Sequence, residues 1–461
     1  MERNKIKKCK GKREKMLKSK NGITLVALVV TIVVLLILAG VSVSLVLQNN
    51  GIINKSKEAR RKYGEAKENE QTDLNNVPSW IDEQVNGNGK KTENLPGNDD
   101  TNPYVIGENF KEKEGTNLDN GLVIEDNLGN EYVWIEVPKS LYENSDYNTE
   151  TTAGDKKPTK STDYDEIEYC IKKYTSAYRS DECDDVYRED TAEGWFADET
   201  EYDTAKKNML KSVYENGGFY IARYEAGISE PRTEAGDATV IPVSKPNMFP
   251  YTFVTRNQAY NLAKQVDSGN RTSCLMFGMQ WDLVLAFIHN KANIDNSILT
   301  TDSASIGNYG SNCWNISNKS AKYLEEDAES WGDCPYVKND GGSVLLTTGA
   351  SDDFCKMNIY DIGGNVSEWT LEKYTVSKPS RSQNTAIKIA SISDFKIKST
   401  KSLAIGVLVK NLYCTIRGGD CEYRVSGSVE ETGAIKRYTS EHKSAQTTDC
   451  GMKIGFRVTI Y

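Results

Sequence analysis

The residues best suited to covalent or metal chemistry are ten cysteines and two histidines, His289 and His442. No two cysteines form a Cys-x-x-Cys pair, so the sequence does not support a zinc ribbon or a thioredoxin-type redox site. Because the chain has only two histidines, a histidine-rich zinc site is excluded. A Ser-His-Asp triad would have to use one of these two. Nine cysteines follow Cys9, an odd number, so at least one is a free thiol or pairs between chains.

A polar segment near the C-terminus carries side chains suited to recognition. Residues 423–450 lie between two short predicted strands, residues 415–419 and 455–461. Aromatic and arginine side chains are favoured in binding patches, and the alternative is an exposed loop without a ligand. The candidate ligand-binding residues are Tyr423, Arg424, Arg437, Tyr438 and His442.

The charge of the chain is divided unevenly. The 461 residues have a formal net charge of −9. Residues 1–22 carry ten basic and two acidic side chains, a net of +8, which leaves −17 on the rest. Because phosphate binding needs a basic surface, this acidic body argues against a nucleic-acid partner.

An uncharged apolar run covers residues 23–47. As a helix its 25 residues would be roughly 37 Å long, enough to cross a bilayer core of about 30 Å. The run is too long for the apolar region of a secretory signal peptide. The basic residues before it would stay in the cytoplasm. The sequence therefore predicts a single-pass protein of the cell membrane whose C-terminal domain is extracellular.

The remaining chain divides into a linker and a globular part. Residues 75–103 are rich in Asn, Gly, Asp and Pro and are predicted to be a flexible linker. Residues 104–461 have globular patterning, with an acidic insertion at about 140–215. Within this part we expect a hairpin at 121–137, a strand at 216–226, and helices at 255–266 and 278–289, the second amphipathic.

The N-terminal segment resembles a type IV prepilin. A basic leader, residues 1–22, ends in Gly22 and is followed by a long apolar helix predicted over residues 23–74. The resemblance implies cleavage after Gly22 by a prepilin peptidase, methylation of Ile23, and association with other pilins. Ala27 stands where pilins have an assembly glutamate, which argues for surface retention more than for filament building. The alternative is an unprocessed membrane anchor.

Six short motifs occur in order along the globular part. They are Asn216–Glu225, Ala259-Tyr260, Met279–Asp282, Asp361–Trp369, Ile416–Gly419 and Ile454–Val458. With these motifs the globular part resembles the formylglycine-generating-enzyme family, also called sulfatase-modifying factors. This family has a variant of the C-type lectin fold, so the resemblance implies an irregular α+β domain. Trp281 and Trp369 are expected to be core anchors.

Enzymes of that family use two cysteines, five residues apart, shortly after the Arg-Gly-Gly motif. Here Cys421 follows Gly419, but Ser426 stands five residues later, and Cys414 precedes the motif. The sequence therefore predicts that the protein is not an enzyme and that Cys421 is a buried thiol or part of a disulfide.

The family also implies a structural Ca²⁺ ion. The matching positions are the side chains of Asp361 and Glu368 and the carbonyls of Gly364 and Val366. Such a set of oxygens suits a hard cation. The alternative is that both carboxylates only hydrogen-bond loop amides.

Together these features predict a surface-displayed, pilin-like protein whose lectin-fold domain binds an unknown extracellular ligand, in adhesion or recognition. One alternative is a minor pseudopilin with a structural role in a type IV pilus or type II secretion system. The other is an enzyme of the formylglycine-generating family.

Overall fold

The computed structural model describes Val34 and residues 95–152, 154–181, 183–187, 196–374, 414–422, 434–435, 437–440 and 453–461. The chain divides into two units, Met1–Lys91 and Thr92–Tyr461, and almost all described residues belong to the second. The predicted membrane helix lies outside the described residues except for Val34, as do Gly22, Ile23 and Ala27. Among the residues that the structure describes, no helix combines the length and apolar character needed to cross a bilayer.

The predicted α+β class is confirmed, because helices are combined with several antiparallel sheets. The largest sheet has six strands, and every neighbouring pair in it is antiparallel. The strand nearest the C-terminus lies inside this sheet, so the end of the chain closes the fold. The order is β1 (Phe110–Glu112), β2 (Val123–Asp126), β3 (Glu131–Glu136), β7 (Gly218–Ala222), β22 (Val458–Ile460) and β10 (Ser273–Leu275).

The predicted hairpin is confirmed in β2 and β3, where Val123 pairs with Val133. Its turn is held by Asp126, whose carboxylate accepts hydrogen bonds from the backbone N–H groups of Leu128 and Asn130 at 2.9 and 2.7 Å. Aspartate favours turns because its short side chain can bond the backbone two residues on.

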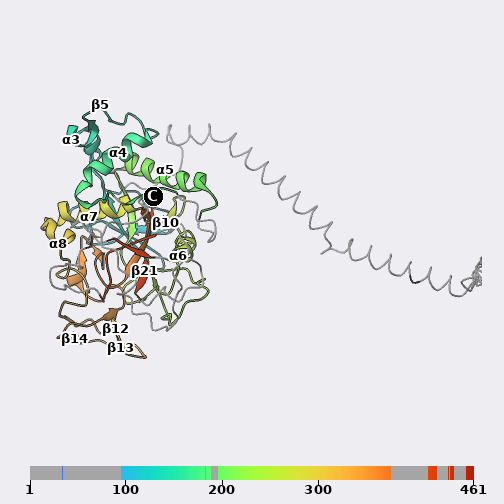
Figure 1. The fold of residues 1–461 in the computed structure, drawn as a ribbon, viewed down its shortest axis with the longest axis vertical. Coiled ribbons are helices and arrows are strands. Elements are labelled where there is room, and N and C mark those ends of the chain that lie inside the picture. Colours follow the sequence, from blue (N-terminus) through green and yellow to red (C-terminus); the bar gives the residue numbers. More distant parts are fainter. Residues whose placement is uncertain are drawn as a thin grey trace, which may run out of the picture. The chain divides into compact units, whose positions relative to one another are not determined.

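Helices dominate the connection between β3 and β7. Figure 1 shows α3, α4 and α5 at one end of the domain and β12, β13 and β14 at the other. Asp185 ties this connection to the core, since its carboxylate accepts from the N–H groups of Gly278 and Met279 at 2.7 and 2.8 Å. The elements are η1 (Lys139–Glu143), α3 (Ser145–Asn148), β4 (Thr149–Glu150), β5 (Gly154–Asp155), α4 (Tyr164–Tyr174), η2 (Ser176–Tyr178), β6 (Cys183–Asp184) and α5 (Glu199–Asn216).

Both predicted central helices are present. Helix α6 (Arg256–Ala263) begins with a capping box formed by Thr255 and Gln258. Helix α7 (Gly278–Ala292) is not amphipathic as expected, because its residues from Gly278 to Ile288 are all buried. The helix contacts β3 of the first sheet and β18 of the second, so no face of its first three turns is left to solvent.

A second sheet carries the C-terminal motifs. Its order is β20 (Arg437–Ser440), β19 (Cys414–Arg417), β18 (Ser367–Tyr374) and β21 (Ile454–Phe456), and β6 also pairs with β18. The single strand predicted over residues 455–461 is therefore two strands in different sheets. The chain passes from one sheet to the other at Arg457, whose buried side chain is described below.

No strand was expected from the sequence in the stretch of chain between the two central helices and the second sheet. It contains β11 (Trp314–Ile316) paired with β14 (Tyr336–Lys338), and a sheet of β13 (Gly332–Asp333), β12 (Lys322–Glu325) and β15 (Val344–Leu346). These strands bury a small core of their own around Trp314 and Phe354. The remaining elements are β8 (Gly227–Ile228), β9 (Phe249–Pro250), α8 (Asn296–Thr300), η3 (Asp352–Phe354), β16 (Cys355–Lys356) and β17 (Ile359–Tyr360).

Candidate functional site

The motif at residues 361–369 leads from β17 into β18 through a turn with unusual backbone angles. Asp361, Gly364 and Asn365 have positive φ values of 55°, 77° and 58°. A Cβ atom added to Gly364 would lie 2.3 Å from the carbonyl oxygen of Asn308, closer than atoms can approach. Glycine is therefore required at this position by both its backbone conformation and its surroundings.

Asn365 holds the turn in place. Its amide nitrogen donates to Glu225 at 2.7 Å and to the carbonyl of Leu346 at 3.2 Å. Its amide oxygen accepts from the N–H of Leu346 and from the side chain of Asn308. Glu225 also accepts from the N–H of Val366 at 3.1 Å. Because both the nitrogen and the oxygen of the buried Asn365 amide have partners, this side chain fixes the loop. Asparagine after Gly364 therefore has a structural role.

Glu368 and Arg457 form a buried ion pair. Arg457 Nη2 lies 2.7 Å from Glu368 Oε1, and Nε lies 3.1 and 3.2 Å from the two carboxylate oxygens. The same guanidinium donates to the carbonyls of Ala222 and Tyr360 at 3.0 and 2.8 Å. Arg457 therefore joins the two sheets where the chain crosses between them.

Two of the positions predicted to bind calcium, Asp361 and Glu368, have partners within the chain. Asp361 accepts a hydrogen bond from the N–H of Gly349 at 3.0 Å, and Glu368 is paired with Arg457. In the part of the chain that the structure describes, no group of three or more His, Cys, Asp or Glu side chains is arranged to hold a metal ion. Both carboxylate oxygens of Glu368 accept from the guanidinium of Arg457, and the predicted Ca²⁺ site stays a prediction.

Burial changes the proton affinity of these carboxylates. Desolvation raises the pKa of Glu225 well above its usual range, and it raises the pKa of Asp361 to about 6. The pKa of Glu368 is also raised by burial, although the guanidinium of Arg457 opposes the shift. These carboxylates act within the folded core and not as solvent-facing groups.

The two predicted core anchors are confirmed. Trp281 and Trp369 have exposed fractions of 0% and 1%, and their indole N–H groups donate to the carbonyls of Ala434 and Val254. Arg417, the arginine of the Arg-Gly-Gly motif, pairs with Asp282 at 2.8 Å. All these contacts hold the fold together.

Cys421 is a buried free thiol, one of the two fates expected from the sequence. Its Sγ shares a hydrogen bond of 3.4 Å with Ser343 Oγ, and burial raises the pKa of the thiol to about 12. Since the thiolate is the nucleophile and the metal ligand, such a thiol is poorly suited to redox chemistry. Gly418 and Gly419, just before it, have φ values of 87° and 75°, which glycine tolerates.

The described residues nearest the two ends of the predicted recognition segment, Glu422 and Lys453, contact each other. Glu422, before the segment, and Lys453, after it, form an ion pair. Asp420 accepts hydrogen bonds from the N–H of Glu422 at 2.9 Å and from the hydroxyl of Ser367 at 3.1 Å. The residues that flank the segment are thus held together beside Ser367 of strand β18.

The middle of this segment contacts the core. Ala434 and Ile435 are buried, and their N–H groups donate to Ser303 Oγ and the carbonyl of Leu299. The segment is therefore not one continuous exposed loop. Of the five candidate ligand-binding residues, Arg437 and Tyr438 lie in strand β20, paired with β19, whereas Tyr423, Arg424 and His442 lie outside the described residues.

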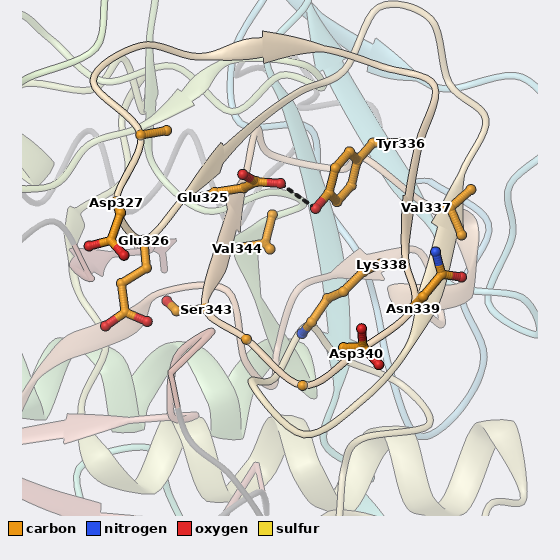
Figure 2. Close-up of a pocket in the computed structure, with 13 residues that line it drawn as sticks. Glu325, Glu326, Asp327, Tyr336, Val337, Lys338, Asn339, Asp340, Ser343 and Val344 are labelled. Atoms are coloured by element: carbon orange, nitrogen blue, oxygen red, sulfur yellow. Dashed lines mark hydrogen bonds between the residues drawn. The ribbon is translucent and has the colours of Figure 1, made fainter.

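A surface hollow of about 540 Å³ lies where β12 and β14 end and β15 begins. Figure 2 shows Glu326 and Asp327 on one side of it, Asp340 on the other, and the side chains of Val344 and Lys338 between them. The acidic residues are exposed, whereas Lys338 is buried and donates to the carbonyl of Tyr309 at 2.6 Å.

The hollow adjoins the base of the recognition segment. Its lining includes Ser343, the residue that contacts Cys421. The hollow was not expected from the sequence, because its lining comes from two stretches, residues 325–328 and 336–344, that only the pairing of short strands brings together. The Glu-Glu-Asp run at residues 325–327 was the only sequence signal for the hollow. By itself such a run indicates no more than an exposed turn.

Comparison with known proteins finds no family model that matches the chain and no curated protein with significant similarity to it. The relation to formylglycine-generating enzymes is therefore still a prediction from the motifs.

Proposed function

We propose that this protein is a surface-displayed binding protein. A C-type-lectin-like domain of the formylglycine-generating-enzyme type, without the enzyme's chemistry, carries a recognition surface outward from a pilin-like membrane anchor. The recognition surface consists of the segment between Glu422 and Lys453 and the adjoining acidic hollow. Its ligand is an extracellular molecule, contacted in adhesion or recognition.

One observation carries the proposal. Glu422 and Lys453, which flank the segment, form an ion pair, and Asp420 beside Glu422 is hydrogen-bonded to Ser367 of the buried strand β18. A variable or functional loop on a rigid scaffold is the common arrangement of binding sites, since the scaffold positions the loop at little entropic cost. The residues of the motif Asp361–Trp369 pack and form hydrogen bonds within the core. They therefore support the recognition surface without being part of it.

The state of Cys421 supports binding over catalysis. Oxidation of a substrate cysteine in this family needs two converging thiols. Cys421 is buried, its pKa is raised to about 12, and its hydrogen-bond partner is the hydroxyl of Ser343. The residue five positions later is Ser426. A single buried thiol of this kind is more typical of a core residue.

The test uses the full-length protein purified in detergent and applied to arrays of immobilised glycans and peptides. We expect retention on one class of probe. A variant with Tyr423→Ala and Arg424→Ala should lose it, and a variant with Glu326→Gln, Asp327→Asn and Asp340→Asn should bind more weakly.

A matched control neutralises three exposed carboxylates elsewhere, with Glu112→Gln, Glu114→Gln and Asp119→Asn. This control should bind as the wild type does. Retention on neither array, or equal retention by the Tyr423 and Arg424 variant, would refute the proposed function.

The proposed anchor has its own test. Mass spectrometry of the mature protein should find an N-terminus at methylated Ile23, as expected after cleavage behind Gly22. A mature chain that still begins at Met1 would contradict processing by a prepilin peptidase and would leave an unprocessed membrane anchor.

A further inference from the structure

The chain contains five copies of the acceptor motif for N-linked glycans, in which asparagine is followed two residues later by serine or threonine. Asn54 lies outside the described residues. A glycan is bulky and polar, so the folded protein accommodates it only on an exposed side chain. The structure therefore decides which of the other four motifs is available. Their asparagines are Asn270, Asn315, Asn318 and Asn365.

Three of these four asparagines are poorly placed. Asn365 is 0% exposed, and its amide is fully engaged in the core, as described above. Asn318 is half-buried, and its amide donates to the side chain of Asn247 at 2.8 Å. Asn315 is exposed, but it lies within β11, where its backbone is paired with β14. Glycan acceptors are typically found in surface loops, which can enter the active site of a transferring enzyme.

Asn270 lies on an exposed turn between α6 and β10. The turn is fixed on both sides of this residue, since the N–H of Arg271 donates to the carbonyl of Ser268 at 2.9 Å and the hydroxyl of Ser268 donates to the carbonyl of Arg271 at 2.7 Å. The guanidinium of Arg271 lies 3.7 Å from the centre of the buried Tyr104 ring. Arg271 thus packs against the domain, whereas Asn270 is left exposed to solvent.

We propose that Asn270, in the motif Asn270-Arg271-Thr272, carries an N-linked glycan. The inference rests on the extracellular location in the proposed function, because such glycans are added to exported proteins. In the transfer, the amide nitrogen of Asn270 bonds to the anomeric carbon of a glycan held on a lipid diphosphate. The bond between that carbon and the diphosphate oxygen breaks, the lipid diphosphate leaves, and one amide proton is released.

A glycan at Asn270 has a consequence for the largest sheet. β10 begins at Ser273, three residues later, and is the last strand in the order of this sheet. The end of a sheet can pair with a strand of another chain, and proteins block such pairing with polar or bulky groups. The glycan therefore hinders association of this edge with a second copy of the protein.

The test uses the protein purified from its native cell membrane, digested with chymotrypsin and analysed by mass spectrometry with fragmentation that preserves glycans. We expect a glycan mass on the peptide that contains Asn270 and none on the three other described motif asparagines. Thr272→Ala should abolish the added mass and Thr272→Ser should keep it, since the motif accepts either hydroxyl. Ser317→Ala, which breaks the motif of Asn315, is the matched control and should leave the mass at Asn270 unchanged.

An unmodified Asn270, or an added mass that persists in Thr272→Ala, would overturn the inference. Labelling of intact cells with a membrane-impermeant amine reagent separates this result from the proposed function. A protein that is labelled but carries no glycan contradicts the inference alone. A protein that is not labelled contradicts the surface location on which both proposals depend.

Discussion

The carboxylate of Asp420 offers a direct test of how burial of a charged group affects the pH dependence of this domain's stability. Its carboxylate has an exposed fraction of 4% and lies between Ser367 on β18 and the N–H of Glu422. Burial raises its pKa from 3.8 to about 7, against the opposing effects of these hydrogen bonds and of Lys453. Asp420→Asn keeps the shape of the side chain and an oxygen for the N–H of Glu422, and it removes the ionisation.

The sign of the effect follows from the direction of the shift. The folded protein holds a proton on Asp420 that the unfolded chain releases above pH 3.8. The resulting stability is therefore fully present below pH 3.8 and is lost as the pH rises through about 7. At about 1.4 kcal/mol per pKa unit, ionisation costs up to about 4 kcal/mol at pH 8, and relaxation of the site reduces this to roughly 1–3 kcal/mol.

Thermal unfolding of the full-length protein at about pH 5 and pH 8 tests this reasoning. We expect Asp420→Asn to melt roughly 1–4 °C above the wild type at pH 8 and about a third as far above it at pH 5, where only part of the pH interval between the two pKa values has been crossed. Asp119→Asn, a change at an exposed aspartate, is the control and should leave the difference between the two pH values unaltered. An Asp420→Asn protein that is less stable than the wild type at pH 8 would show that the ionised carboxylate stabilises the fold.

Three further predictions concern the core and the thiols. Replacing Trp369 by Ala should cost about 3–5 kcal/mol in urea unfolding, because its indole is 1% exposed. Gly364→Ala should prevent folding or cost more than about 2 kcal/mol, whereas Gly115→Ala, with φ of 84° but no atom within 4 Å of the added Cβ, should cost about 1 kcal/mol; equal losses would contradict the steric argument. Alkylation of the native protein followed by peptide mass spectrometry should modify the exposed Cys313 and leave the buried Cys421 intact until denaturant is added. Rapid native labelling of Cys421 would show that the thiol is accessible.

Short-range patterns accounted for much of the fold. The turn at residues 127–130, the cap at Thr255 and the strand after Asn216 all depend on neighbouring residues, and each is present. Helix α7 was expected to have one polar face, but tertiary packing between two sheets buries its first three turns. The strands from β11 to β15 were missed because each is only two to four residues long, too short for a periodic signal.

The candidate site shows the same division. The importance of the motif around Asn365, the core positions of Trp281 and Trp369, and the absence of a second cysteine at residue 426 could be read from the amino acids and their spacing. The acidic hollow could not, because its two stretches meet only through strand pairing. The partners of Glu368 could not either, since Arg457 lies 89 residues away in the chain.

The sequence by itself determined which residues are apolar, which turns need glycine, and that the segment after Cys421 is polar. Only the tertiary structure decided which charges meet. A buried carboxylate needs a partner, and the chain can supply a guanidinium from any position that folding brings within about 3 Å. The family resemblance implied calcium at Glu368, and only the packed domain shows that Arg457 lies beside this carboxylate.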